Sequence, residues 1–153
     1  MKRIFFCLVV LLAISCNKVN VSNVPYARVY LELDLTYKDK DLVGALNFKE
    51  ITSTSGQNYG TQLGYSGVLV VSGFDSNGNT KYYAYDLCCP HEANKNTMVK
   101  ADNTGWAECP KCGTKYEIAY GTGTPSDGPS EFALTRFDVT QQGNKLLIRY
   151  CQL

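Results

Sequence analysis

Four potential metal ligands lie in two closely spaced pairs, and this arrangement constrains the fold more than any other feature of the chain. Cys89 and His91, the only histidine, form the first pair, and Cys109 and Cys112 form the second, with seventeen residues between the pairs. A proline follows the leading cysteine of each pair and restricts both turns. Donor pairs on two separate loops, brought together by folding, are typical of a four-ligand metal site. The sequence therefore predicts that these two loops face one another.

The N-terminal segment has the features of an export signal. Lys2 and Arg3 precede an apolar stretch, residues 4–14, that is too short to span a bilayer comfortably. A small residue and Cys16 follow, and this ending resembles the lipobox of bacterial lipoproteins, in which the cysteine is acylated and becomes the new N-terminus. An ordinary signal peptide with an incidental cysteine is the alternative, because Ala13 stands where leucine is usual.

We predict that residues 1–15 are a signal peptide, that Cys16 is lipidated, and that residues 16–25 tether a folded domain of residues 26–153. A lipid on Cys16 would hold the domain at a membrane surface without spanning the membrane. The expected location is the bacterial cell envelope, outside the cytoplasm, with the membrane as a partner through the anchor. The chain has 15 Lys and Arg against 14 Asp and Glu, so no nucleic acid partner is expected.

Strand signals dominate residues 26–153, so the predicted fold class is all-β. Residues 27–37 alternate apolar and polar side chains with the period of a half-buried strand. Asn77-Gly78 is a strong hairpin signal between two apolar segments. Further strands are expected within residues 44–52, 67–74, 80–88, 96–110, 114–120 and 132–150, and Gly-rich loops at 55–67 and 121–131.

The cysteine pairs and the elements around them resemble the Rieske iron-sulfur domain. That family has a C-x-H box and a C-P-x-H-G-[S/T]-x-[Y/F] box; this chain has "CPH" from Cys89 and "CPKCGTKY" from Cys109. The strand pair between the boxes, the Gly/Pro loop and the closing hairpin keep the family order over about residues 65–151. The resemblance implies an antiparallel β-sandwich with a small metal-binding subdomain of two cysteine-bearing loops, about residues 86–120.

By this resemblance, Cys89, His91, Cys109 and Cys112 hold a 2Fe-2S cluster. The family uses two cysteines on one iron and two histidines on the other, and Cys112 stands where the second histidine is expected. A thiolate in place of a neutral imidazole adds negative charge and lowers the reduction potential, toward the plant-type value of about −400 mV. One of the two histidine titrations that make Rieske potentials fall with pH is also lost.

Other positions follow from the same resemblance. Thr114 stands where a hydroxyl often donates a hydrogen bond to a cluster sulfur, and Tyr116 occupies the aromatic position. Some family members carry a disulfide between the two cluster loops. Its positions fall at Asn94 and Lys111 in this chain, so that bridge is absent.

The function implied by the resemblance is a membrane-tethered one-electron carrier that works with a redox partner protein. In such a carrier the cluster performs the chemistry, and the protein tunes its potential and access. The only histidine is assigned as a ligand, which leaves no Ser-His or Cys-His arrangement for nucleophilic catalysis. The protein is therefore not expected to be an enzyme.

Zinc and disulfides are the alternatives at the same residues. Three cysteines with one histidine also form an ordinary structural zinc set, and thiols of exported proteins oxidise to disulfides. Cluster insertion precedes export and requires transport of a folded protein, yet "KRIFF" only faintly resembles a twin-arginine signal. In this alternative the chain is a non-redox structural or binding lipoprotein.

Three further interpretations concern the remaining features. A zinc-ribbon-like module would leave the Gly/Pro loop and the closing hairpin without an explanation. Cys88 can compete with Cys89 as a ligand, although the motif spacing favours Cys89. Cys151 is either a buried thiol or a partner for Cys88.

Overall fold

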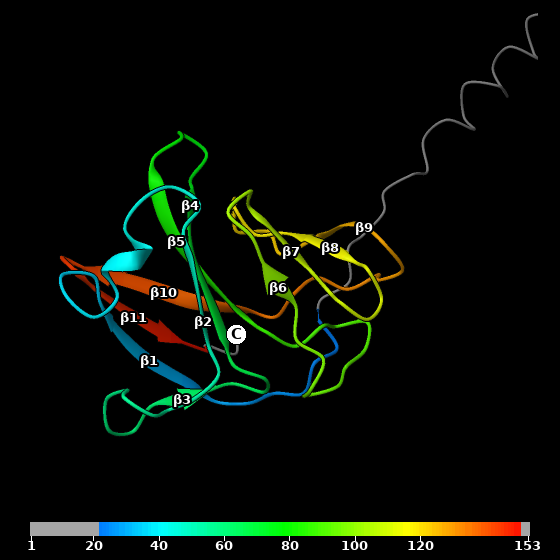
Figure 1. The fold of residues 1–153 in the computed structure, drawn as a ribbon, viewed down its shortest axis with the longest axis horizontal. Helices are drawn as coiled ribbons and strands as arrows, with labels where there is room; N and C mark the ends of the chain where they lie inside the picture. Colours follow the sequence, from blue (N-terminus) through cyan, green and yellow to red (C-terminus); the bar gives the residue numbers. More distant parts are fainter. Residues whose placement is uncertain (1–21, 151–153) are drawn as a thin grey trace, which may run out of the picture.

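The computed structural model describes residues 22–150, which form two antiparallel β-sheets (Figure 1). This confirms the all-β prediction. The larger sheet has the strand order β2-β4-β5-β10-β11-β1-β3. Its strands are β1 (Val29–Asp34), β2 (Phe48–Ile51), β3 (Gln62–Leu63), β4 (Val68–Phe74), β5 (Thr80–Asp86), β10 (Arg136–Gln142) and β11 (Lys145–Arg149). A short 3₁₀ helix, η1 (Lys40–Leu42), follows β1.

The smaller sheet is inserted in the chain between β5 and β10. It has the order β6-β7-β8-β9 and contains β6 (Lys100–Ala101), β7 (Trp106–Glu108), β8 (Lys115–Glu117) and β9 (Pro125–Asp127). The first cysteine-bearing segment precedes β6, and the second connects β7 to β8. A second sheet therefore lies in the part of the chain where the sequence predicted a subdomain of two cysteine-bearing loops.

One hydrophobic core lies inside the larger sheet. It collects side chains from β1, β2, β4, β5, β10 and β11, so strands from both halves of the sheet contribute to one cluster. Leu31, Leu146 and Ile148 are completely buried in it. The alternation of residues 27–37 is explained by this core, because every second side chain of β1 points into it.

A second core lies between the larger sheet and the smaller one. Val68 and Val70 of β4 belong to the first core, whereas Leu69 and Val71 belong to the second. The strand is thus buried on both faces, which explains its continuous run of apolar residues. The second core also contains Cys89 and Cys109, so the cysteine loops are part of the packing between the sheets.

Gly73 lies at a close contact between β4 and the segment that follows β8. A Cβ atom at this position would lie 1.9 Å from the carbonyl oxygen of Ala119, just beyond β8. The next residue, Phe74, donates its backbone N–H to that same oxygen at 2.8 Å. Only glycine fits this contact, because any other side chain would overlap the backbone of the smaller sheet.

Both predicted Gly-rich loops contain a short strand that the sequence did not indicate. β3 lies in the loop of residues 55–67 and pairs with β1, and β9 lies in the loop of residues 121–131 and pairs with β8. Strands of two and three residues are too short to show a period of two, and the pairing depends on the neighbouring strand.

Within residues 22–150 the structure contains no helix that is long and hydrophobic enough to cross a membrane. The predicted signal peptide, the predicted lipidation site Cys16 and most of the predicted tether lie outside the described residues, as does Cys151.

Candidate metal centre

The two cysteine-bearing loops form the same five-residue turn. In the first, the backbone N–H of Ala93 donates to the carbonyl oxygen of Cys89 at 2.9 Å; in the second, Gly113 donates to Cys109 at 2.9 Å. Each turn ends in a left-handed conformation, with φ of 46° at Ala93 and 72° at Gly113. Proline after each leading cysteine supplies the fixed φ that starts the bend.

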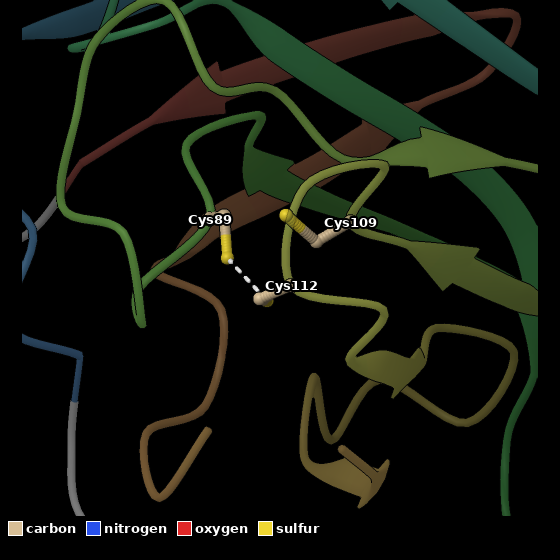
Figure 2. A group of neighbouring side chains, drawn as sticks. All are labelled: Cys89, Cys109 and Cys112. Atoms are coloured by element: carbon tan, nitrogen blue, oxygen red, sulfur yellow. Dashed lines mark hydrogen bonds between the residues drawn. The ribbon is translucent and has the colours of Figure 1, made fainter. Parts of the chain in front are cut away.

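Three cysteine sulfurs meet where these turns face one another (Figure 2). The Sγ atoms of Cys89, Cys109 and Cys112 all lie within 4.8 Å of one another. Those of Cys89 and Cys112 are 3.7 Å apart, and neither residue is in a disulfide. Cys89 and Cys109 are completely buried, whereas Cys112 is partly exposed. Folding therefore gathers three of the four predicted ligands.

His91 is not part of this sulfur group. It is exposed, and the three-residue group does not include its ring nitrogens. Its place in the turn explains the difference: His91 is the third residue of the first turn, equivalent to Lys111, which is also exposed. Cys112 is the fourth residue of the second turn. His91 lies two residues from Cys89, and its role as a ligand stays a prediction.

Two hydroxyl groups lie beside the sulfurs: that of Thr114, where the resemblance implied a hydroxyl, and that of Tyr116, where it implied only an aromatic side chain. The Tyr116 hydroxyl is 3.4 Å from Cys89 Sγ, and Thr114 Oγ1 is 3.2 Å from Cys112 Sγ. Both side chains are completely buried. An O–H group directed at a thiolate stabilises its negative charge, so both residues can tune a group bound at the site.

The Gly/Pro loop of residues 121–131 closes over Thr114. The backbone N–H of Ser130 donates to Thr114 Oγ1 at 3.3 Å. A Cβ atom at Gly128 would lie 2.5 Å from Thr114 Cα, and Gly128 has a φ of +96°. The glycine therefore allows the loop to approach the second turn and cover its hydroxyl.

The surroundings of the thiols give them different acidities. Burial raises the pKa of Cys109 to about 12. Burial also raises the pKa of Cys112, but hydrogen bonds with Thr114, Cys109 and Cys89 together outweigh it, so this thiol has a pKa below its ordinary value. Cys112 is thus the more readily deprotonated of the two. A bound metal cation would favour deprotonation of Cys109 as well.

Cys88 is buried but lies outside the three-sulfur group. Its thiol hydrogen-bonds the carbonyl oxygen of Asn94 at 3.5 Å, and burial raises its pKa to about 11. The preference for Cys89 over Cys88 as the candidate ligand agrees with this placement. A pairing of Cys88 with Cys151 stays a prediction, since Cys151 lies outside the described residues.

Sequence reasoning did not identify Asp86, which fixes the entry to the first turn. Its buried carboxylate accepts hydrogen bonds from the backbone N–H groups of Tyr65, Ser66 and Cys88, at 2.7, 3.1 and 2.8 Å. Burial raises the pKa of Asp86, and these N–H groups counteract the rise. An aspartate two residues before a bonded N–H is a common turn signal and was available in "YDLCC".

The ion pair between Glu92 and Lys111 was also missed. It joins the first turn to the second, and the Glu92 side chain is only 13% exposed. The sequence shows both charges, but it does not show that the two turns bring them together.

Comparison with known proteins gives structural similarity only. No protein-family model and no curated protein sequence matches the chain. The structure is similar to the Sphingomonas yanoikuyae B1 ferredoxin, with 15% sequence identity, a TM-score of 0.47, and coverage of 82% of this chain and 98% of that chain. It is also similar to a chain in the complex of reduced oxygenase and oxidized ferredoxin in carbazole 1,9a-dioxygenase, with 15% identity, a TM-score of 0.46, and coverage of 84% and 95%.

Proposed function

We propose that the protein is a membrane-tethered, Rieske-like iron-sulfur protein that carries one electron through a 2Fe-2S cluster. The observation that carries the proposal is the gradient of exposure across the predicted ligands. Cys89 and Cys109 are completely buried, Cys112 is partly exposed, and His91 is exposed. An electron carrier needs a centre shielded from water on one side and close to the surface on the other.

The donor set fits this cluster in its chemistry. Thiolates bind both iron ions of ordinary 2Fe-2S centres, and imidazole replaces thiolate in the Rieske type. The family resemblance assigns the two buried cysteines to one iron and the two more exposed ligands, His91 and Cys112, to the other. This division agrees with the exposure gradient. Since His91 lies outside the sulfur group, its side chain would have to turn toward Cys112 to bind.

The residues of this chain have separate tasks in such a carrier. Cys89 and Cys109 hold the buried side of the centre within the second core, where apolar neighbours exclude water. The Cys112 thiol donates to the Thr114 hydroxyl, and the Tyr116 hydroxyl lies at hydrogen-bond distance from Cys89 Sγ. With the cysteines deprotonated, both hydroxyls can donate to sulfur and raise the potential, whereas the thiolate of Cys112 lowers it relative to imidazole. When bound, the cluster supplies the one-electron chemistry.

The membrane tether is supported by the short segment up to and including Cys16, which resembles a lipobox. The substitution Cys16→Ser should move the protein from the membrane fraction to the soluble fraction. Incorporation of labelled fatty acid that persists in this variant would overturn the tether. The redox partner protein is expected in the same cell envelope.

A structural zinc site is the second candidate, because one distance favours it. Zinc-sulfur bonds of about 2.3 Å give a tetrahedral edge of roughly 3.8 Å. The Sγ atoms of Cys89 and Cys112 are 3.7 Å apart. The resemblance would place these residues on different irons, whereas a single zinc ion would bind both sulfurs at this separation. In this case the site staples the two turns and transfers no electron.

Metal analysis of protein purified from its native host distinguishes the two candidates. We expect two irons and two acid-labile sulfides per chain, a red-brown colour, and a paramagnetic resonance signal after reduction. One zinc per chain and no iron would establish the structural site and exclude the carrier.

Cys112→His then sharpens the test, because it restores the family ligand set. The reduction potential of this variant's cluster should rise from about −400 mV into the Rieske range of about −150 to +300 mV. Cys88→Ser, at a neighbouring thiol outside the group, should leave the potential unchanged.

A further inference from the structure

A hollow with an excess of positive charge lies on the larger sheet, across β5, β10 and β11. Its volume is about 500 Å³, and its lining includes Lys81, Arg136 and Arg149 but one acid, Asp138. The whole chain has nearly equal numbers of basic and acidic residues, 15 and 14. The three-to-one ratio in the hollow is therefore a local concentration of charge rather than a property of the chain.

None of these three cations forms an ion pair with a carboxylate of residues 22–150. The ion pairs found within residues 22–150 involve other lysines, namely Lys49, Lys100, Lys111 and Lys115. Asp138 lies opposite Arg149 across the β10–β11 pair, but one carboxylate cannot balance three basic side chains on neighbouring strands, so the remaining repulsion costs free energy. An anion bound in the hollow would remove this cost.

Arg136 is already held in position for such a ligand. One of its terminal nitrogens, Nη1, donates to the carbonyl oxygen of Gly121 at 2.7 Å, and its guanidinium lies 5.2 Å from the centre of the Tyr83 ring. Tyr83 is fixed in turn by its hydroxyl, which donates to the carbonyl oxygen of Phe74 at 2.7 Å. The Lys81 ammonium lies over the same ring at 5.8 Å. Pre-positioned donors lose less conformational entropy on binding.

We propose that this hollow binds the phosphate group of an organic molecule. Three cations approach from three strands, and Thr140 adds a hydroxyl to the lining. Several donors from different directions, with a net charge of about two, suit a doubly charged oxyanion with several acceptor oxygens better than a carboxylate with a single charge. The tyrosine side chains in the lining can contact the organic part. The proposal is independent of the metal centre.

Free phosphate esters and phospholipid headgroups share this chemistry. Tyr150 lines the hollow, and the ring of Tyr26 packs 5.1 Å from the ring of Tyr150. Tyr26 lies ten residues after the predicted lipidation site, Cys16. The hollow is thus close to the segment that leads toward the predicted anchor. The experiments therefore compare a phospholipid headgroup with a free phosphate ester as the ligand.

The first experiment titrates inorganic phosphate into the full-length protein and follows amide signals by nuclear magnetic resonance. We expect shifts at Lys81, Thr140 and Arg149, and an affinity that falls about tenfold in Arg149→Gln. Lys145→Gln removes the same charge from the same strand outside the hollow and should keep the wild-type affinity. The absence of shifts, or an equal loss in both variants, would overturn the proposal.

The second experiment separates the two sources. Sedimentation with phosphatidylcholine vesicles, with and without phosphatidylglycerol, uses the Cys16→Ser background so that no lipid anchor contributes. Binding that requires phosphatidylglycerol, is displaced by phosphate and is lost in Arg149→Gln but not Lys145→Gln identifies a headgroup. Phosphate binding without vesicle binding identifies a free phosphate ester. If neither phosphate nor phosphatidylglycerol binds, the proposal is wrong.

Discussion

The larger and the smaller sheet are stabilised by very different means. β4, β5 and β10 of the larger sheet have seven residues each, whereas no strand of the smaller sheet exceeds three. The first core consists of aliphatic and aromatic side chains. The second core includes the candidate ligands Cys89 and Cys109. Regular structure can stabilise the larger sheet by itself, whereas the smaller sheet depends on its site and on its contact with β4 and β5.

This difference predicts that removing a ligand has a local effect and removing a core side chain has a global one. Metal bound by folded loops contributes its binding free energy to their folding, which amounts to about 10 kcal/mol or more for structural zinc at neutral pH. The four tests below run from the largest expected effect to the smallest.

Cys109→Ala should have the largest effect. We expect loss of the metal and rapid hydrogen exchange across residues 88–130, with β1, β10 and β11 still protected, because the first core does not involve the site. Hydrogen exchange with mass spectrometry and metal analysis measure both. Cys88→Ala is the matched control and should retain the metal. A Cys109→Ala protein with full metal content would contradict the assignment of the site.

Leu31→Ala should instead destabilise the whole described domain. Leu31 is completely buried in the first core, so its truncation leaves a cavity and costs about 2–5 kcal/mol. Denaturant unfolding, followed both by circular dichroism and by metal release, should show the two transitions shifted together. Tyr37→Ala, at a side chain that is 79% exposed, should change little. Separate shifts would show that the smaller sheet does not rely on the larger one.

Gly73→Ala tests the contact between the sheets. The new Cβ would lie 1.9 Å from the Ala119 carbonyl oxygen, so the sheets must move apart at a cost of roughly 1–3 kcal/mol. Faster hydrogen exchange around Ala119 than in β1 should accompany the loss. Gly56→Ala is the control, since a Cβ there meets nothing within 4 Å and carries only the strain of φ +72°. Equal destabilisation by both substitutions would mean that the close approach has no special role.

The same division between the sheets explains what the sequence could predict. β1 and the β10-β11 hairpin were predictable, because alternation and the Gly143 turn are local signals repeated over several residues. β9 was not predictable, because its pairing with β8 arises only when the Gly/Pro loop folds over Thr114. Short strands carry too few residues to encode their own partners.

The candidate site divides in a similar way. The motif spacing predicted one site for four residues, and in the structure the sulfurs of three of them, Cys89, Cys109 and Cys112, lie together. It did not show that His91 occupies the exposed third position of its turn, which depends on backbone direction. Nor did it show that Asp86 binds the N–H of Cys88 while it also binds a distant loop.

The ion pair between Glu92 and Lys111 should have the smallest effect. It connects the two turns directly, but a bond between partly exposed charges is weak and screened by salt. Glu92→Gln or Lys111→Gln should accelerate metal loss to a chelator by less than about fivefold at low salt, and the difference should vanish at high salt. Exchange of the two charges in Glu92→Lys with Lys111→Glu should recover part of the rate, because the attraction between the turns is restored. The pair of Glu108 and Lys115, 3.8 Å apart on neighbouring strands of the smaller sheet, provides the control. Neutralising this pair removes no contact between the two turns, so the rate of metal loss should not change. An acceleration that persists at high salt would show that packing of these side chains, rather than their charge, holds the turns together.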